Sequence, residues 1–557
     1  MKEQNLEARC KEIPMRHFRK EKKQEKKYLP SNMVAPPSFL FLLVDDVGWA
    51  DVGYNGGIAK TPILDTWASE PSSLKLLDMH SGGTVCSPSR ATVLTGRSHQ
   101  RDCVDYVYDA SDPTESTPSM NFAPQETFTI AKAVSASHYP YSSFFGGKWH
   151  LGALSNDANI TSSPSTHGFD HWNCTQEVSP TATTNCNCKT EWSDKCNYGH
   201  YLSPNHCAGD TNPGGGPPGC CFNYWWPVET SEFGGIRNYT KLIEGEDSLY
   251  VIDSFRTFLD SNNNSNPFLS QLSFHNCHIP YIGSPDAVES CKNHTTCLAP
   301  QPGEDQYTPD ELDYYSCIAD LDKSVGLLLE LLKSRDLYDN TLIMLTSDNG
   351  PEVNCDDGLC GGTNAARPQG QMDIDGFTNY ASGSAGVLRG RKRDIWEGGH
   401  RVPGILSYPP LIKQNRIIRN FPVVTMDFLP TIMDILDVDR PEDQKDWGFD
   451  GISLVPLMKG GDEEELGDRG IGWWYRDAAP NVDDGYGYRY GVWKLVVGSS
   501  SCASDFCKKP QLYNLKSDLS ELHDLSHSEP EVLEAMLERF STWNASVSLS
   551  RECESMC

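Results

Sequence analysis

Two short apolar runs, each followed closely by acidic residues, restrict most strongly what this chain can fold into. Residues 39–44, FLFLLV, lead directly into Asp45 and Asp46, and residues 341–346, TLIMLT, lead into Asp348. Each run has the length and continuous apolar character of a strand buried on both faces of a parallel sheet. Charged groups that follow such strands lie in the crevice at the carboxyl edge of an open sheet. We therefore expect a doubly wound α/β domain with a polar site at that edge.

The order of the other segments indicates a large domain followed by a small one. Apolar residues at helical spacing over 312–337 predict a helix that leads into the second strand. A chain of 557 residues is longer than one hydrophobic core usually serves. We expect a basic leader over 1–37, a catalytic domain over 38–460 with a Cys-rich insertion without core character at about 174–235, and a smaller α+β C-terminal domain over 461–557 with a short antiparallel sheet.

Charge and hydropathy argue against a nucleic-acid partner and against a membrane-spanning segment. The net charge is −29, which disfavours a nucleic acid as the partner. The sequence has no apolar run of about eighteen residues or more, so we expect no membrane span.

The cysteines indicate an oxidising compartment. The chain has 20 of them, more than a reducing compartment usually tolerates. Setting aside Cys10 and Cys86 leaves an even number, eighteen, that could form up to nine disulfides. A zinc array would need C-x-x-C pairs, which neither the C-x-C at 186–188 nor the adjacent pair at 220–221 provides. Glycosylation sequons support the same compartment; they begin at Asn159, Asn173, Asn238, Asn263, Asn293 and Asn544.

The N-terminal segment does not fit a simple secretory start. Residues 1–37 contain no apolar region of a signal peptide and carry a basic stretch, HFRKEKKQEKK, at 17–27. We interpret the segment as a disordered leader or as the result of a mis-assigned start, because the cysteines argue against a nuclear-targeting signal. The expected location is the secretory pathway, with the protein secreted, at the cell surface, or in a lysosome or vacuole.

Residues 86–97, CSPSRATVLTGR, carry the most specific pattern. Cys86 lies in a proline-containing turn ahead of a helix-compatible run, and Arg90 follows four residues later. A helix N-terminus and a guanidinium both stabilise negative charge, so these residues alone indicate a reactive thiolate or an anion site. The segment also matches the signature C-x-P-S-R-x-x-x-L-T-G-R at every fixed position. The chain thus resembles the type I, formylglycine-dependent sulfatases of the alkaline-phosphatase superfamily.

The resemblance extends from about residue 38 to residue 525. It implies an alkaline-phosphatase-like fold, with a large, mixed, mostly parallel sheet flanked by helices. It also implies an arylsulfatase-like sulfuric ester hydrolase in which Cys86 is converted to formylglycine (3-oxoalanine) by the formylglycine-generating enzyme.

The same resemblance implies a calcium site. Asp45 with Asp46, and Asp348 with Asn349, would form its two halves, and residue 86 would complete it. Calcium prefers hard oxygen ligands, which three carboxylates and an amide supply. An isolated Asp-Asp pair is more often a helix cap or a solvated turn, but two acidic pairs on either side of the nucleophile motif favour the metal site.

Residues 147–152, GKWHLG, match a second block of the family. Alternation along a strand would place Lys148 and His150 on one face. The resemblance implies that Lys148 binds the sulfate and formylglycine oxygens, and that His150 hydrogen-bonds the formylglycine hydroxyl.

Three further residues complete the expected site. In HNCHIP at 275–280, His278 matches the family histidine that contacts the ester oxygen, and His275 is expected to be structural. In LRGRKRDIWEGG at 388–399, Lys392 matches the sulfate-binding lysine. Ser179 occupies the place of a sulfate-contacting serine.

The resemblance implies a role for each of these residues in sulfate ester hydrolysis. Formylglycine supplies the nucleophile, while Arg90, Lys148 and Lys392 neutralise charge on the sulfuryl oxygens. His278 protonates the departing alcohol. These cations would also form a basic pocket within an acidic chain.

The expected substrate is a sulfated polysaccharide, with a sulfated small molecule such as a steroid or aryl sulfate left open. The block at 388–399 is spelled most like that of arylsulfatase B-like, N-acetylgalactosamine-4-sulfatase-type enzymes. Two other functions were weighed. One is a phosphodiesterase or phosphonate hydrolase of the same superfamily, and the other is a catalytically silent glycan-binding relative, which would require a substitution that the site residues do not show.

Overall fold

The computed structural model describes much of the chain between residues 35 and 553. The described ranges are 35–107, 127–152, 162–175, 223–229, 237–242, 247–262, 266–278, 283–292, 297, 309–352, 383–444, 449–475, 485–498 and 509–553. Ser179, nearly all of the expected leader and most of the expected insertion lie outside them.

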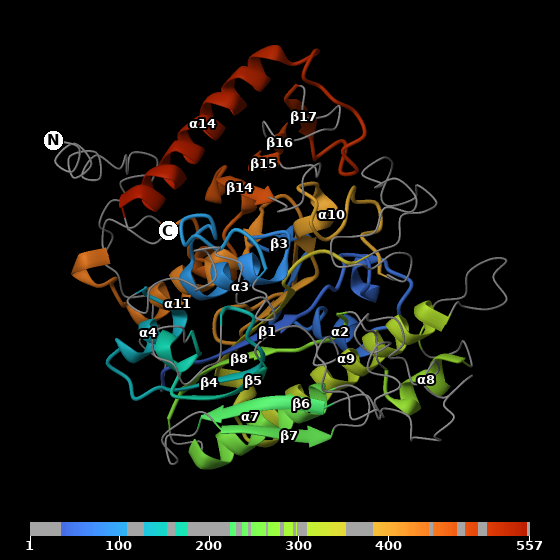
Figure 1. Cartoon of the computed structure of the whole chain (residues 1–557), viewed down its shortest axis with the longest axis vertical. Coiled ribbons are helices and arrows are strands. Elements are labelled where there is room, and N and C mark those ends of the chain that lie inside the picture. Colours follow the sequence, from blue (N-terminus) through green and yellow to red (C-terminus); the bar gives the residue numbers. More distant parts are fainter. Residues whose placement is uncertain are drawn as a thin grey trace.

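A mixed ten-stranded sheet forms the centre of the molecule (Figure 1), in the order β12-β2-β11-β9-β1-β8-β4-β5-β6-β7. Its middle is parallel: β1 (Ser38–Val44) lies between β8 (Phe268–Ser273) and β9 (Thr341–Ser347). On the other side of β8, β4 (Ser142–Lys148) and β5 (His171–Thr175) continue the parallel arrangement. The prediction that 39–44 and 341–346 form buried parallel strands is therefore confirmed.

The edges of the sheet are where antiparallel pairing occurs. On one side, β11 (Gly404–Ser407) runs antiparallel to both β9 and β2 (Ser73–Leu76), and β12 (Arg416–Ile418) is parallel to β2. On the other side, β6 (Asn223–Glu229) and β7 (Arg237–Leu242) extend the sheet beyond β5. The expectation that about 174–235 stands apart from the core is wrong at its two ends, because β5 and β6 belong to the central sheet.

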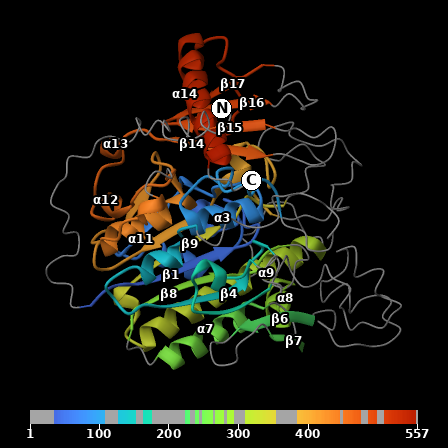
Figure 2. The same ribbon diagram turned by 60° about the vertical axis from the view of Figure 1, so that its left-hand side comes forward.

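Helices cover both faces of the sheet, as β1 illustrates. The side chains of Leu40, Leu42 and Val44 face a cluster that contains residues of α2 (Pro62–Trp67), α7 (Ser248–Asn262) and α9 (Pro309–Ser334). Phe39, Phe41 and Leu43 face the opposite cluster, with residues of α3 (Cys86–Thr95), α4 (Ile130–Ser135) and α11 (Phe428–Leu436). Side chains alternate between the faces of a strand, and so one fully apolar strand joins two cores. Figure 2 shows the two helical layers from a second direction.

Several shorter helices and strands complete the described part of the chain. They are α8 (Pro285–Lys292), α10 (Glu397–His400), α12 (Val455–Met458), α13 (Glu463–Leu466), β3 (Met79–His80), β10 (Arg401–Val402), β13 (Val423–Val424) and the 3₁₀ helices Gly53–Asn55, Ser165–His167, Tyr338–Asn340, Thr425–Asp427 and Glu442–Gln444. Strand β3 lies between β10 and β13 in a small sheet of its own. None of the described helices is long and apolar enough to cross a membrane.

An antiparallel sheet follows in the C-terminal part, as expected. It consists of β14 (Gly470–Tyr475), β15 (Gly485–Tyr490), β16 (Trp493–Gly498) and β17 (Gln511–Asn514), in that order. Helix α14 (Pro530–Cys553) packs on it through Met536 and Phe540. In Figure 1 the sheet and α14 lie above α10 and β3. A domain boundary near residue 460 stays a prediction.

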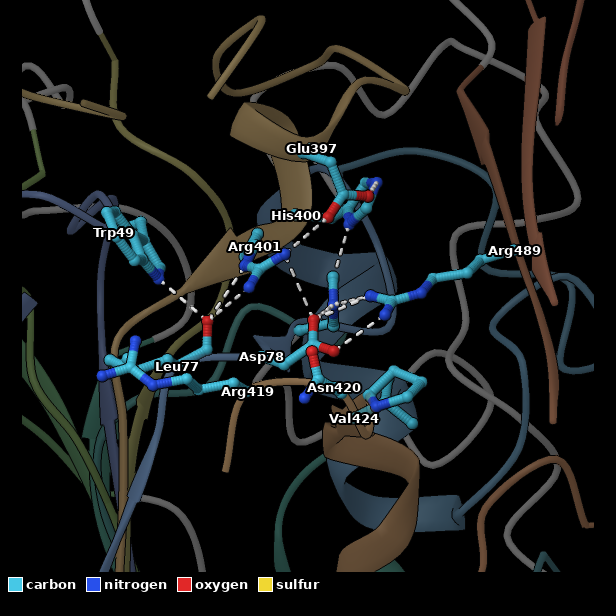
Figure 3. Close-up of polar contacts among 12 residues, drawn as sticks. Trp49, Leu77, Asp78, Glu397, His400, Arg401, Arg419, Asn420, Val424 and Arg489 are labelled. Carbon is cyan, nitrogen blue, oxygen red and sulfur yellow. Dashed lines mark hydrogen bonds and ion pairs between the residues drawn. The ribbon is translucent and has the colours of Figure 1, made fainter. Parts of the chain in front are cut away.

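A buried charge network joins this C-terminal sheet to the larger part (Figure 3). Arg489 of β15 donates hydrogen bonds of 2.7 Å to both carboxylate oxygens of Asp78, next to β3. The guanidinium of Arg401 lies 3.3 Å from Asp78 and 3.3 Å from Glu397 of α10. Lys494 of β16 donates to Glu397 Oε1 at 3.0 Å. Strands β15 and β16 thus hold both β3 and α10 through ions that are shielded from water.

The cysteines only partly follow the expectation. Cys291 and Cys297 form a disulfide, and Cys103 is disulfide-bonded as well. Cys174, Cys277 and Cys317 are buried and form no disulfide, so the full nine disulfides that the eighteen cysteines could have formed are not reached. A buried thiol behaves as a small apolar side chain and needs no covalent partner.

Candidate active site

Cys86 is the first residue of α3 and is buried at the carboxyl edge of the central sheet. Its Sγ lies 3.7 Å from Asp45 Oδ1 and 3.4 Å from Lys148 Nζ. Burial raises the pKa of the Cys86 thiol to about 12, although the charges of Lys148 and Lys392 act to lower it. Burial thus acts against a thiolate at the unmodified residue, and the interpretation of this helix N-terminus as the place of a reactive thiolate or of an anion site stays a prediction.

The two acidic pairs meet because their strands are neighbours. Val44 at the end of β1 is in register with Ser347 at the end of β9, so the following turns lie side by side. The backbone N–H of Asp46 donates to Asp348 Oδ1 at 3.3 Å, and Asn349 Nδ2 donates to Asp46 Oδ1 at 2.6 Å. All four side chains, including that of Asp45, are buried. Burial and the negative charge of Asp45 raise the pKa of Asp348 to about 6.

These groups fit a hard divalent cation. The cluster combines three buried carboxylates with a buried amide oxygen, Asn349 Oδ1, that accepts no hydrogen bond from a described residue. Potential ligand atoms of Asp45, Asp46, Cys86 and His278 all lie within 4.8 Å of one another. Several oxygen donors around one point are what Ca²⁺ prefers.

Three buried cations face these carboxylates. Arg90 donates to Asp348 Oδ2 from Nε at 3.0 Å and from Nη2 at 2.7 Å. Lys148 Nζ lies 2.5 Å from Asp45 Oδ2, and Lys392 Nζ lies 2.6 Å from Asp46 Oδ2. A carboxylate and an ammonium held together in a buried site stabilise each other's charged forms. Three cations thus face three carboxylates, and a basic pocket that receives an anionic substrate stays a prediction.

His278 reaches the same place from the turn after β8. Its Nε2 lies 3.3 Å from Lys392 Nζ and 3.6 Å from Asp46 Oδ2, and its side chain is 13% exposed. The structure therefore brings together nine residues selected from the sequence: Asp45, Asp46, Cys86, Arg90, Lys148, His278, Asp348, Asn349 and Lys392. His150 is held next to them by its backbone, through Ser87.

The expectation that Lys148 and His150 share one face of a strand is wrong. Strand β4 ends at Lys148, and His150 has a φ of 54°, outside any strand conformation. The bend begins at Gly147, where φ is 92° and a Cβ would lie 1.9 Å from the carbonyl oxygen of Ser273. The buried His150 is fixed to α3 instead, because its carbonyl accepts a hydrogen bond of 2.6 Å from Ser87 Oγ.

Sequence reasoning missed the group that fixes the Lys392 loop. The backbone N–H of Lys392 donates to Pro351 O at 3.1 Å. Next to it, the carboxylate of Glu352 forms ion pairs with Arg391 and Arg393 on either side of the lysine. Glu352 lies two residues after the Asp348–Gly350 turn, and this position was its signal in the sequence. The metal half-site and the Lys392 loop are thus connected by one carboxylate.

A second group, His80, Glu397 and His400, has metal-like spacing but is already satisfied. Lys494 Nζ donates to His400 Nε2 at 2.9 Å, the two Nδ1 atoms lie 3.0 Å apart, and His80 Nε2 lies 2.9 Å from Asp78 Oδ1. Lysine only donates and carboxylate only accepts, which sets one direction for the hydrogen bonds along this chain. Burial lowers the pKa of both histidines. His80 and His400 are therefore a neutral, hydrogen-bonded pair inside the ion network of Figure 3. Lys494, Arg401 and Arg489 already supply the positive charge of that network.

Comparison with protein families gives two matches. A family described as Sulfatase matches residues 37–438, and one described as N-sulphoglucosamine sulphohydrolase, C-terminal, matches residues 390–544. Human steryl-sulfatase is 25% identical over 572 residues, which cover 91% of this chain and 88% of that protein. Canine N-acetylgalactosamine-6-sulfatase is 25% identical, with 90% and 84% covered.

Solved structures share the fold. Ps i-CgsB in complex with k-i-k-neocarrahexaose has a TM-score of 0.65 at 22% identity, covering 93% of this chain and 94% of that one. The phosphonate monoester hydrolase of Agrobacterium radiobacter has a TM-score of 0.54 at 18% identity, covering 92% and 96%. These similarities confirm the expected alkaline-phosphatase-like architecture.

Proposed function

The chain belongs to the sulfatase family and hydrolyses sulfate esters, and we propose that it does so on sulfated glycans, through a formylglycine made from Cys86 and with the help of Ca²⁺. The observation that carries this proposal is the position of residue 86. Its side chain lies beside the ion pair of Asp45 and Lys148, within the buried acidic cluster. A nucleophile, a cation site and basic groups therefore converge on one point.

Two groups would be added to the chain. When bound by Asp45, Asp46, Asp348, Asn349 and residue 86, Ca²⁺ supplies positive charge beside the nucleophile and the sulfuryl oxygens. Formylglycine supplies a hydroxyl nucleophile in its hydrated form.

The side chains of the protein then divide the remaining work. Arg90 holds Asp348 in place through two hydrogen bonds. Lys148 and Lys392 neutralise the charge that develops on the sulfuryl oxygens, in a site where low exposure strengthens the interaction. His278 Nε2 gives a proton to the departing alcohol oxygen, and His150 orients the hydroxyl of residue 86. Ser179 is proposed as a further contact to sulfate.

The substrate class rests on the relatives. N-acetylgalactosamine-6-sulfatase and the carrageenan-oligosaccharide complex favour a sulfated glycan, whereas steryl-sulfatase favours a steroid sulfate. We propose the glycan, and we place the protein in the secretory pathway because Cys291–Cys297 requires oxidising conditions. The formylglycine-generating enzyme would act on the chain there.

The test is a substrate panel on protein produced together with the formylglycine-generating enzyme. Sulfated oligosaccharides, a steroid sulfate, a nitrophenyl sulfate, a phosphodiester and a phosphonate monoester are compared by kcat/KM. We expect the oligosaccharides to be cleaved best and Cys86→Ala to abolish every activity. The likeness to a phosphonate monoester hydrolase makes that activity the competing function. A higher kcat/KM on the phosphonate or the steroid sulfate would contradict the proposed substrate.

A further inference from the structure

Three buried side chains beside the active site form a continuous hydrogen-bonded array. Asp247 Oδ2 lies 2.7 Å from His275 Nδ1, and His275 Nε2 lies 2.8 Å from Thr175 Oγ1. A carboxylate only accepts, so Nδ1 carries the proton, and in the neutral ring Nε2 accepts the hydroxyl hydrogen of Thr175. Both nitrogens of the imidazole are thereby used, and the ring is held in one orientation. The exposures are 2% for Asp247, 6% for His275 and 5% for Thr175.

The array connects elements that carry the active site. Thr175 ends β5 and is in register with Lys148 at the end of β4. Its carbonyl accepts a hydrogen bond of 3.0 Å from the backbone N–H of Trp149, next to Lys148. Asp247 lies immediately before α7, and its carbonyl accepts the N–H of Val251 at 3.1 Å. His275 therefore links the end of β5, which lies beside Lys148, to the start of α7.

The backbone of His275 leads directly to His278. The N–H of His278 donates to the carbonyl of His275 at 2.8 Å, which closes a tight turn. Within this turn Asn276 O accepts the N–H of Asp45 at 2.8 Å, and the N–H of Cys277 donates to Asp45 O at 2.7 Å. The centre of the turn is therefore fixed by Asp45. Its first residue, His275, is held through its own imidazole. Its last residue, His278, places Nε2 3.3 Å from Lys392 Nζ.

We propose that His275, held by Asp247 and Thr175, is a positioning residue that aims His278 at the ester oxygen. This inference rests on the proposed function, in which His278 protonates the leaving group. Proton transfer requires hydrogen-bond distance between donor and acceptor, and so a small rotation of the turn matters more to the acid than to the buried sulfate-binding lysines. The side chain of His278 is also more exposed than that of Lys392, 13% against 5%. It has less packing around it to correct its direction.

The experiment uses a matched pair of variants at Thr175. Thr175→Val removes the hydroxyl and keeps the branched shape, and Thr175→Ser keeps the hydroxyl. His275→Gln is the third variant. Each is assayed on an alkyl or sugar sulfate, whose alcohol leaves only with a proton, and on a nitrophenyl sulfate, whose phenolate leaves unaided.

We expect Thr175→Val and His275→Gln to lower kcat for the alkyl sulfate roughly 10-fold, as expected for a misplaced acid. The nitrophenyl sulfate should lose clearly less, KM should change little, and Thr175→Ser should retain wild-type behaviour. When His278→Ala is already present, His275→Gln should cause no further loss on the alkyl sulfate. Thermal melting of each variant verifies that the chain is folded.

The outcomes separate the inference from its premise. Equal losses on both substrates, or additive losses in the His278→Ala background, would overturn the positioning role alone. If His278→Ala itself shows no dependence on the leaving group, the acid assignment fails and this inference fails with it. If the wild-type enzyme cleaves no sulfate ester of a glycan, the proposed substrate fails. The variants can still be compared on an alkyl sulfate.

Discussion

Replacing Arg489 by methionine would test whether the buried ion network attaches the C-terminal sheet to the larger part of the molecule. Asp78 is completely buried and receives both of its shortest hydrogen bonds, 2.7 Å each, from Arg489. Burial alone would raise the pKa of Asp78, but the guanidinium groups of Arg489 and Arg401 outweigh it and hold that pKa well below its usual range. In Arg489→Met the carboxylate loses its principal counter-ion while remaining buried.

The magnitude follows from the partners that remain. Removal of one partner of a buried ion pair typically costs about 3–5 kcal/mol. Asp78 would keep His80 at 2.9 Å and the more distant Arg401 at 3.3 Å. We therefore expect a loss at the lower end, roughly 3 kcal/mol in the free energy of unfolding. Methionine retains most of the apolar stem of arginine, which limits any contribution from lost packing.

The assay is urea unfolding followed by tryptophan fluorescence. Trp473 is completely buried and stacks on His400 with ring centroids 3.8 Å apart, so its emission reports on this interface. Asp78→Asn and the double variant complete a thermodynamic cycle, for which we expect a coupling of about 2 kcal/mol. A loss below about 1 kcal/mol for Arg489→Met, or additive losses in the cycle, would refute the reasoning.

The acid side of the stability profile adds a check on Asp78. Its folded pKa is lowered, so the stability from its ionisation is fully present above the unfolded value of 3.8 and is lost as the pH falls toward the folded pKa. Arg489→Met should reduce this acid-dependent part, because the counter-ion that lowers the pKa is gone.

Four further predictions concern other parts of the molecule. Mass spectrometry of the peptide that contains residue 86 should show a loss of about 18 Da relative to cysteine, and an unmodified thiol in fully active protein would contradict the formylglycine assignment. Calcium should raise the melting temperature of chelator-treated protein but have much less effect on Asp46→Asn, and restoration by zinc alone would make the metal assignment wrong. Gly350→Ala should reduce both kcat/KM and calcium affinity, because its Cβ would lie 1.9 Å from Gly398 O, and a wild-type calcium titration would speak against this coupling. Burial lowers the pKa of His167 from 6.5 to about 3, so between these two pH values this histidine is protonated mainly in the unfolded chain. In that window the free energy of unfolding should fall by roughly 1.4 kcal/mol per pH unit from this group, and His167→Gln should flatten that slope.

Much of the site could be predicted from the sequence because its groups lie in short, local patterns. Runs 39–44 and 341–346 identified buried strands, since a strand covered on both faces needs apolar residues at every position. The acidic residues after them were correctly assigned to the carboxyl edge. The pattern around Cys86 and the lysine at 392 were found by resemblance, and the structure brings both to that edge.

The tertiary structure decided everything that depends on which segments become neighbours. Asp46 and Asp348 are 302 residues apart, and they meet only because β1 and β9 pair in register. The conformation of His150 depends on a close approach of Gly147 to β8, which strand periodicity cannot show. Cys174 remained unpaired because a disulfide requires a second cysteine at a suitable distance, whatever their total number.

The same distinction explains two further features whose partners sequence reasoning did not identify. His275 was expected to be structural, but its partners Asp247 and Thr175 come from separate segments. Arg489 and Asp78 are 411 residues apart, and neither lies in a pattern that would connect them. A local sequence specifies backbone conformation and the face that will be buried. Which buried polar groups satisfy one another is fixed only when distant elements pack, because burial makes an unpaired charge too costly to leave.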